Sequence, residues 1–143
     1  MKKIKVRQLA GHTPLYATNH AAGADLTALI AADITLKPLA KAIISTGLIL
    51  AIPNGYEGQV RSRSGLSSKY GIMVINGVGT IDSDYRGEIK VPLINLSNED
   101  YTIKNGDRIA QLVISPVVQA KFIKVSKLKA TRRGAGGFGS SGY

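Results

Sequence analysis

The 143-residue sequence contains no cysteine. This absence excludes disulfide bridges and thiolate metal sites, and it fits a reducing compartment such as the cytosol. Long apolar runs are also missing: none approaches the roughly 18 residues of a membrane-spanning helix. The Met-Lys-Lys start lacks the apolar stretch of a signal peptide. We therefore expect a cytoplasmic protein that makes no membrane contact.

Acidic residues are few: 9 Asp and Glu stand against 19 Lys and Arg, which gives a net charge of +10. Such a balance is typical of nucleic-acid-binding proteins. However, the basic residues are scattered, and their densest runs are residues 2–5 and 121–133. No zinc-finger spacing, Walker loop or RNA-recognition aromatic pattern accompanies them. A nucleotide partner explains the charge as well, so we favour it over nucleic acid.

Short runs rich in Ile, Val, Leu and Thr, separated by Gly, Pro and Asn, predict an all-β fold. Their spacing is typical of a jelly-roll-like or sandwich-like β-barrel. A helical turn is expected at Leu66–Tyr70, with the Ser64 hydroxyl as a possible cap. The expected strands are Ile4–Leu9, Asp25–Thr27, Ile34–Leu36, Ala42–Leu50, Tyr56–Arg63, Gly71–Val74, Ile89–Leu96, Tyr101–Ile103, Arg108–Pro116 and Ala120–Val125.

The most informative stretch runs from Asn76 to Val91. Runs of β-forming residues flank it at 71–75 and 89–94, and Gly and Asx residues cluster between them, where the chain must reverse. A plain hairpin turn needs about two to five residues. This reversal is longer, and it contains the carboxylate of Asp82 and the ring of Tyr85. We interpret it as a pocket that binds a flat polar ligand beside an activating group.

Two further polar stretches precede this one. Asp25 follows Gly23 at the start of an expected strand, where it either forms part of a simple turn or orients an arginine or a metal-bound water. Residues 61–67 are either a solvated loop or an anion cradle. In the second case Arg63 offers a bidentate fork and Ser64 a hydroxyl at a helix start.

Two more stretches follow it. Gln111 interrupts a run that otherwise reads as a buried strand, and a buried amide costs about 1–3 kcal/mol unless its hydrogen bonds are met. It is either satisfied by neighbouring backbone or directed at a ligand, and Asp107 and Arg108 before it are candidates for a structural ion pair. The composition of the glycine-rich end, residues 132–143, is typical of a flexible terminus. Alternatively it folds over a nucleotide, with Phe138 on the base.

Together the five stretches resemble, in order, the five motifs of the trimeric deoxyuridine triphosphatase (dUTPase) family. They are Ala-Gly-Ala-Asp-Leu, Arg-Ser-Gly-Leu, Asn-Gly-Val-Gly-Thr-Ile-Asp-Ser-Asp-Tyr-Arg-Gly, Gly-Asp-Arg-Ile-Ala-Gln-Leu and Arg-Gly-Ala-Gly-Gly-Phe-Gly-Ser-Ser-Gly, and they extend from residue 22 to residue 142. The resemblance implies Mg²⁺-assisted hydrolysis of dUTP to dUMP and pyrophosphate, which keeps uracil out of DNA and supplies dUMP for thymidylate synthesis. It also implies a jelly-roll-like homotrimer with active sites at subunit interfaces.

The resemblance also assigns residues. The barrel would span residues 1–130, and residues 131–143 would be an arm that closes over the active site of a neighbouring subunit. Asp82 would be the general base that activates the attacking water, and Asp25 would touch the metal through water. The residues expected at uracil and deoxyribose are Asn76, Gly79, Thr80, Ile81, Tyr85, Lys90 and Phe138. Those expected at the phosphates are Arg63, Ser64, Gly65, Gln111, Arg133, Gly139 and Ser140.

Three alternatives remain open at this level. A deoxycytidine triphosphate deaminase of the same fold would need a glutamate on the returning strand, where this chain has Pro92. A non-catalytic dUTPase-like protein would bind partners without turnover. A basic β-barrel that binds nucleic acid would show binding to oligonucleotides that falls steeply with salt.

Overall fold

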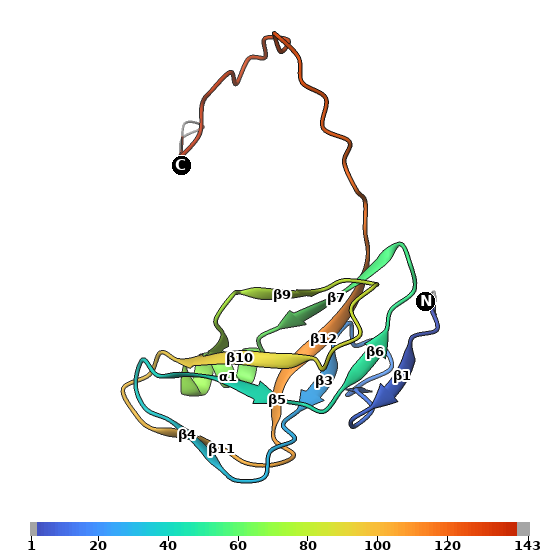
Figure 1. Ribbon diagram of the computed structural model, residues 1–143. Helices are drawn as coiled ribbons and strands as arrows, with labels where there is room; N and C mark the ends of the chain where they lie inside the picture. The colour runs from blue at the N-terminus through green and yellow to red at the C-terminus, as the bar shows by residue number, and fades with distance from the viewer. Residues whose placement is uncertain (1–2, 140–143) are drawn as a thin grey trace.

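The computed structural model describes residues 3–139 (Figure 1). Within this range the regular structure is β-sheet apart from one short helix, which confirms the all-β prediction. No helix in residues 3–139 is long and apolar enough to cross a membrane. The elements are β1 (Arg7–Ala10), β2 (Leu15–Tyr16), β3 (Ala24–Thr27), β4 (Ile34–Leu36), β5 (Lys41–Ser45), β6 (Ile49–Ala51), β7 (Tyr56–Arg61), α1 (Ser64–Tyr70), β8 (Ile72–Val74), β9 (Val78–Ile81), β10 (Lys90–Asn95), β11 (Tyr101–Ile103) and β12 (Arg108–Pro116).

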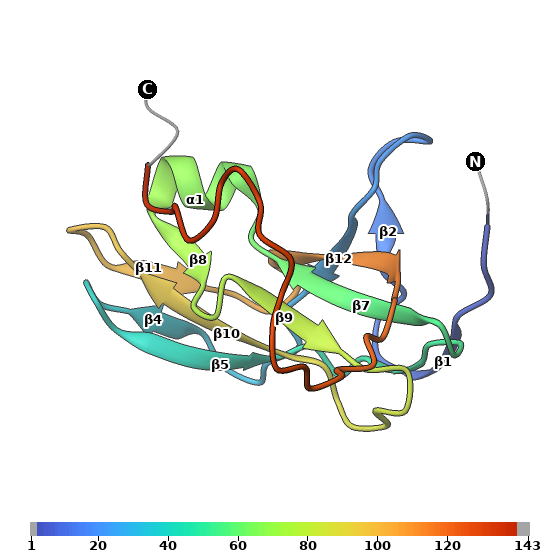
Figure 2. The same ribbon diagram turned by 90° about the horizontal axis from the view of Figure 1, so that it is seen from above.

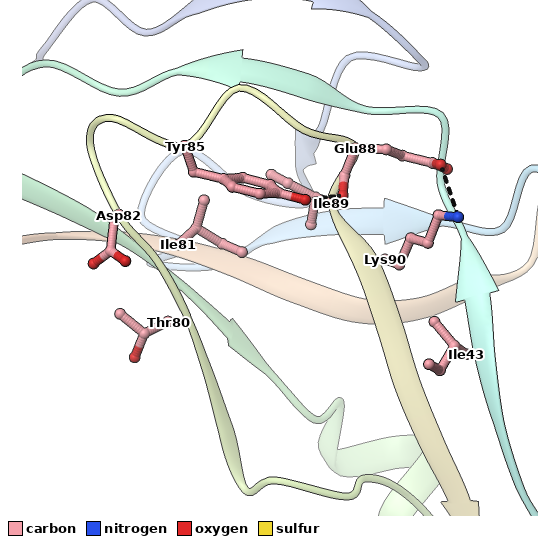
Figure 3. A pocket seen from close by; sticks show the side chains of 8 residues that line it. All are labelled: Ile43, Thr80, Ile81, Asp82, Tyr85, Glu88, Ile89 and Lys90. Atoms are coloured by element: carbon pink, nitrogen blue, oxygen red, sulfur yellow. Dashed lines mark hydrogen bonds and ion pairs between the residues drawn. The ribbon is translucent and has the colours of Figure 1, made fainter.

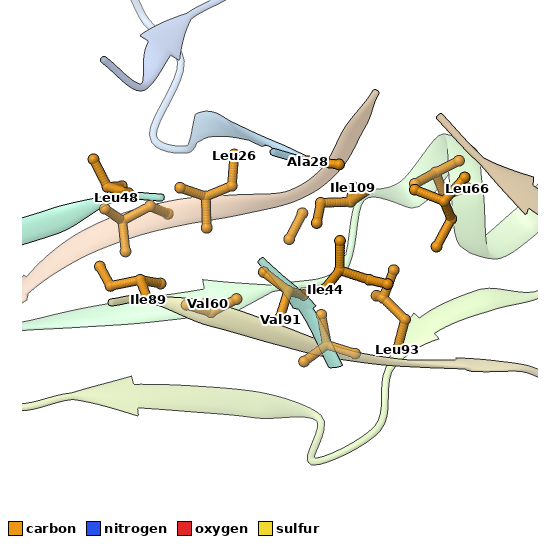
Figure 4. Close-up of a cluster of buried hydrophobic side chains, with 14 of the residues drawn as sticks. Leu26, Ala28, Ile44, Leu48, Val60, Leu66, Ile89, Val91, Leu93 and Ile109 are labelled. Atoms are coloured by element: carbon orange, nitrogen blue, oxygen red, sulfur yellow. The ribbon is translucent and has the colours of Figure 1, made fainter. Parts of the chain in front are cut away.

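The strands form a five-stranded sheet in the order β2-β3-β12-β7-β9 and a three-stranded sheet in the order β5-β10-β8. Two further pairs, β1-β6 and β11-β4, complete the barrel (Figure 2). Alternate side chains of both sheets point into one apolar core, which includes Leu26 from β3, Val60 from β7, and Val91 and Leu93 from β10 (Figure 4). This core holds the polar loops at the strand ends in place.

The reversal between Gly71 and Ile94 differs from the expectation of one long hairpin. Strands β8 and β10 do pair antiparallel, with Val74 opposite Leu93, as their flanking position predicts. However, the connection leaves this sheet and forms β9, which pairs with β7 in the other sheet, with Gly58 opposite Ile81. The reversal therefore bridges two sheets. Its remaining loop, residues 82–89, connects β9 to β10.

The expected strand Ala42–Leu50 is two strands. The chain breaks at Gly47, whose φ of +64° is a conformation that favours glycine, so β5 pairs with β10 while β6 pairs with β1. The Thr46 hydroxyl fixes the break, because it donates to the carbonyl of Ile89 and accepts the N–H of Leu48.

Two other expectations at this level are wrong. The segment Ala120–Val125 is not a strand, because within the described residues it has no strand partner, and Phe122 is 95% exposed. The helix begins at Ser64, so the cap position belongs to Arg63, and no side chain caps the helix.

Beyond β12 the chain runs away from the barrel as a segment without helix or strand, residues 117–139 (Figure 1). One backbone bond, from Val117 N–H to Gly55 O, marks its departure. Large apolar side chains along it are exposed, among them Val118, Phe122, Ile123 and Leu128. Such a row of exposed apolar groups is unusual for a segment that stays alone in water.

Candidate functional site

Strand pairing brings the first, second and fourth motifs together. On β12, Gln111 lies opposite Asp25 of β3 on one side and Arg61 of β7 on the other. Two residues after the end of β7 comes Arg63, followed directly by α1. Side chains separated by up to 86 positions in the sequence therefore meet at one end of the five-stranded sheet.

Asp25 links two arginines in this cluster. Its Oδ1 accepts from Arg63 Nε at 2.9 Å, and its Oδ2 accepts from Arg108 Nη1 at 3.2 Å. The Asp25 side chain is 18% exposed, so these interactions are partly shielded from water. Arg63 Nη1 also donates to the carbonyl of Arg108 at 3.0 Å. Of the two sequence readings for Asp25, the structure supports the one in which it orients an arginine.

Residues 61–64 contain two consecutive Arg-Ser pairs, and the contacts of each pair differ. Arg61 hydrogen-bonds to Gln59 on its own strand, whereas Arg63 reaches Asp25. Ser62 has a structural part, since its Oγ accepts the N–H of Val74 at 2.8 Å. Ser64 is exposed at the start of α1, as is Gly65 beside it, where an added Cβ would meet open space. Arg63 and Ser64 are thus the pair that can face a ligand.

Gln111 is half-buried, and its amide donates to the carbonyl of Ser62 at 2.9 Å. For this N–H group, the interpretation in which neighbouring backbone satisfies the Gln111 amide therefore holds. Its other end packs against Gly23: a Cβ on Gly23 would lie 2.1 Å from Gln111 Oε1. The glycine of the first motif is required because Gln111 occupies the space beside it.

The proposed ion pair of Asp107 with Arg108 does not form. Arg108 pairs with Asp25, and Asp107 Oδ2 instead accepts the N–H of Lys104 at 2.8 Å within a turn. Asp107 therefore shapes the loop that leads into β12.

The third motif lines an open pocket of about 700 Å³ (Figure 3). Five of its residues come from the sequence expectations: Thr80, Ile81, Asp82, Tyr85 and Lys90. The other three are Ile43, Glu88 and Ile89. The pocket opens between the end of β9, the loop 82–89, the start of β10 and strand β5 (Figure 3).

Asp82 stands at the rim of this pocket. Its side chain is exposed and makes no hydrogen bond or ion pair with the rest of residues 3–139, while its carbonyl accepts the N–H of Tyr85 at 3.1 Å and closes a turn. Both carboxylate oxygens are thus free to accept hydrogen bonds from a ligand or a water.

Tyr85 is fixed by two features of the loop. Its hydroxyl donates to the carbonyl of Glu88 at 2.9 Å. Its ring packs over Gly87, where an added Cβ would lie 2.3 Å from the Tyr85 hydroxyl oxygen. The ring therefore lies along the pocket with its hydroxyl directed toward Glu88 (Figure 3).

Glu88, which the sequence reading did not single out, links three elements. Its Oε1 accepts the N–H of Gly47 at 2.8 Å, and its Oε2 lies 3.5 Å from Lys90 Nζ. Partial burial acts to raise the pKa of this carboxyl. The Gly47 N–H bond and the Lys90 charge outweigh that effect and lower the pKa below its ordinary value. The sequence signal that could have identified Glu88 is its opposite charge to Lys90, two residues later, because side chains at this spacing share one face of an extended chain.

The remaining expected residues lie elsewhere in the chain. Asn76 and Gly79 are not part of the pocket lining; they lie toward the other end of β9, with Gly79 opposite Val60. In the C-terminal segment Arg133 donates to the carbonyl of Gly136, and Phe138 and Gly139 are exposed. Ser140 lies outside the described residues.

The two clusters occupy opposite ends of the β7–β9 pair. Arg61 lies opposite Val78 and Gly58 opposite Ile81, so Arg63 follows the Val78 end of β9 while Asp82 follows the Ile81 end. At roughly 3.3 Å per strand residue, β9 alone separates the two ends by about 10 Å. One chain thus presents two half-sites, one basic with hydroxyls and one with a free carboxylate beside an aromatic ring.

Comparison with known proteins gives a consistent result. The dUTPase family model matches residues 10–142. A deoxyuridine 5'-triphosphate nucleotidohydrolase of Wolbachia from Brugia malayi is 57% identical, over 98% of this chain and 94% of that protein. A structure of the Staphylococcus bacteriophage 80alpha dUTPase with dUpNHpp has a TM-score of 0.88 and 28% identity, and it covers 99% of this chain and 100% of that chain.

A mutant dUTPase from phage phi11 of S. aureus, whose structure describes the coordination of a structural Mg(II) ion, has a TM-score of 0.79. It is 25% identical, and the match covers 89% of this chain and 100% of that chain. The family match over nearly the whole chain, with more than half of the residues identical to a curated relative, leads to one conclusion: this chain belongs to the dUTPase family.

Proposed function

We propose that this enzyme hydrolyses dUTP to dUMP and pyrophosphate, with Asp82 as the base that activates the attacking water. The single observation that supports it most is the pocket in which the free carboxylate of Asp82 lies beside the ring of Tyr85. The 57% identical relative is named for the same activity. In the cell this reaction would keep uracil out of DNA and supply dUMP for thymidylate synthesis, and the sequence predicts a cytoplasmic location.

Asp82 would accept a proton from water as that water attacks the α-phosphate. Its carboxylate has no protein partner in residues 3–139 to compete for the water. An aspartate is a weak base, so its proton acceptance alone contributes part of the rate, and positioning together with charge neutralisation must supply the rest.

The basic cluster would hold the phosphates. Arg63 uses its Nε and Nη1 for Asp25 and the Arg108 carbonyl, which leaves further N–H groups of the same rigid fork for a phosphate oxygen. Ser64, Gly65 and Gln111 lie next to it along β12 and α1. From the C-terminal arm, Arg133 and the backbone N–H groups of Gly139 and Ser140 would grip the terminal phosphate.

The donor set fits a magnesium ion that the substrate itself holds. No group of three or more Asp, Glu, His or Cys side chains within residues 3–139 is placed to bind a metal. Asp25 already accepts from two arginines, so it is suited to contact a metal-bound water and not the ion. Mg²⁺ favours phosphate oxygens and waters in such sites, where it would neutralise phosphate charge.

Base and sugar would be selected in the pocket. The backbone of Thr80, Ile81 and Lys90, with Asn76 and Gly79 along β9, would read the uracil edge, and Phe138 of an arm would stack on the base. Tyr85 would pack against the deoxyribose and crowd out a ribose 2′-hydroxyl. Crowding by a fixed ring rejects an added hydroxyl better than a tolerant apolar pocket does.

A homotrimer would assemble these parts. The basic cluster and the pocket lie at opposite ends of β9 in one chain, and the segment 117–139 carries exposed apolar side chains away from its own barrel. Both observations favour a site built from several copies, with the 1–130 barrel as the body and the 131–143 arm closing over a neighbour.

Pyrophosphate release from dUTP, dCTP, dTTP and UTP, each with Mg²⁺, tests the proposal. We expect selective release from dUTP. Deamination of dCTP would instead support the deaminase alternative, and a folded protein that turns over none of the four nucleotides would leave a binding protein. Steep salt dependence of binding to oligonucleotides would point to the nucleic-acid alternative.

A further inference from the structure

The contacts around Glu88 connect the sugar-binding ring to the body of the barrel. We infer that Glu88 is a positioning residue that fixes Tyr85 and thereby sets the discrimination between deoxyribose and ribose. This inference rests on the proposed function, because it assigns Glu88 a part in the selection that Tyr85 would perform.

The Tyr85 hydroxyl is held by the backbone of Glu88. Its acceptor is the main-chain carbonyl of Glu88 itself, at 2.9 Å. Tyr85 is 44% exposed, so the protein packs against one part of the ring while solvent reaches the other. Any displacement of the Glu88 backbone therefore moves the acceptor that orients the ring.

Three hydrogen bonds hold that backbone in place. The side chain of Glu88 accepts the N–H of Gly47 at 2.8 Å, and two neighbouring bonds join the same segments: Ile89 N–H to Leu48 O at 2.8 Å, and the Thr46 hydroxyl to Ile89 O. Residues 88–89 are thus attached to the break between β5 and β6. Of these three bonds, the one from Gly47 is made by the Glu88 side chain.

The two residues before Glu88 do not attach the loop to the barrel through their side chains. Gly87 precedes Glu88 and has no side chain to hold the loop; its Cβ would in fact collide with Tyr85. Arg86 donates to the carbonyls of Ser83 and Tyr85, so its contacts stay inside the loop. Without the Glu88 carboxylate, the hydrogen bonds of Ile89 to Leu48 and Thr46 are what still anchors the Glu88 carbonyl to the barrel within residues 3–139.

Lys90 completes the arrangement. Its ammonium lies 3.5 Å from Glu88 Oε2, whereas the Gly47 N–H bonds to the other oxygen, Oε1. The carboxylate is thus held from two directions, which restricts its rotamers. In this arrangement Glu88 acts through Tyr85.

The test measures the selectivity ratio, kcat/KM for dUTP divided by kcat/KM for UTP. Glu88→Ala should lower this ratio at least tenfold, mainly through faster turnover of UTP relative to dUTP. Glu88→Gln should restore most of it, because the amide oxygen can still accept the Gly47 N–H. Glu99→Ala is the control: the exposed Glu99 side chain makes no hydrogen bond or ion pair within residues 3–139 and does not line the pocket, so its ratio should equal that of wild type.

A double variant separates positioning from general loosening. Tyr85→Phe removes the hydroxyl bond directly and should lower the ratio. Adding Glu88→Ala to Tyr85→Phe should then change the ratio little further, because both changes act on one bond. If the fold-changes in the ratio caused by the two single substitutions multiply in the double variant, the inference is contradicted.

The outcomes remain distinguishable. If wild type releases no pyrophosphate from dUTP, the proposed function fails whatever Glu88 does. If wild type prefers dUTP and Glu88→Ala keeps the wild-type ratio, the inference about Glu88 fails and the proposed function stands. Should Glu88→Ala not fold, Glu88→Asp replaces it: its shorter side chain withdraws from Gly47, and an unchanged ratio in that variant would overturn the inference equally.

Discussion

The Nε of Arg63 donates to Oδ1 of Asp25 across 2.9 Å, which joins strand β3 to the residue that directly precedes helix α1. The second oxygen of Asp25 receives Arg108. One carboxylate thus orients the arginine to which we assign phosphate binding.

Replacing Asp25 by asparagine should therefore weaken substrate binding. The amide keeps one acceptor but loses the charge that holds both guanidinium groups, so we expect kcat/KM for dUTP to fall about tenfold or more, mainly through KM. Steady-state kinetics measure it. Glu99→Gln is the control, because the exposed Glu99 side chain has no partner in the described part of the chain. A KM equal to that of wild type would show that Asp25 does not orient Arg63.

A second prediction concerns Gly23. An alanine there would place a Cβ 2.1 Å from Gln111 Oε1, so Gln111 must move and its bond to Ser62 is strained. We expect a loss of about 1–3 kcal/mol in the free energy of unfolding, as is typical of overpacking. Denaturant unfolding without nucleotide measures it. Gly65→Ala is the matched comparison: its Cβ meets open space within a helix, so that variant should be as stable as wild type or more stable.

The pH dependence of the free energy of unfolding should reveal the lowered pKa of Glu88. Its pKa is lowered in the folded protein: burial opposes the shift, while the Gly47 N–H, the Lys90 charge and a bond to Ser45 produce it. A depressed pKa contributes stability above the unfolded-state pKa, and this contribution is lost as the pH falls through the folded-state value. Wild type should therefore exceed Glu88→Gln in unfolding free energy at neutral pH, and the difference should shrink in acid. A difference that grows on acidification would contradict the assignment.

The sequence predicts those features that depend on local pattern. The pairing of β8 with β10 followed from two β-forming runs around a reversal, and Thr80, Ile81, Asp82, Tyr85 and Lys90 do gather in one pocket. Strand β9 was not expected, because its pairing with β7 depends on a partner about 20 residues earlier. Periodicity alone does not give that register.

Other differences have similar causes. Gly47 divides an apparently continuous apolar run because it adopts a positive φ, and the run from Ala120 to Val125 has the composition of a strand without a partner in the described chain. Glu88 was missed because its partner Gly47 is 41 residues away, and its importance lies in a backbone N–H that no motif records.

The C-terminal arm provides the next prediction. Deleting residues 133–143 should sharply reduce turnover of dUTP while the unfolding transition stays that of wild type, since the segment 117–139 lies outside the core. Unchanged turnover would mean that the arm is a passive tail. If sites combine residues of several copies, refolding the truncated chain together with an Asp82→Asn chain should restore part of the activity, and strict absence of recovery would favour sites within one chain.

The Asp82→Asn variant tests the central claim most directly. Turnover of dUTP with Mg²⁺ should fall by roughly 10²–10⁴-fold, the usual contribution of a positioned general base. Calorimetric titration with the non-hydrolysable analogue dUpNHpp should give a Kd close to that of wild type, because the exposed Asp82 side chain makes no hydrogen bond or ion pair with the rest of residues 3–139. This combination, lost turnover with retained binding, is the predicted result. A variant that hydrolyses dUTP at the wild-type rate would show that Asp82 is not the base.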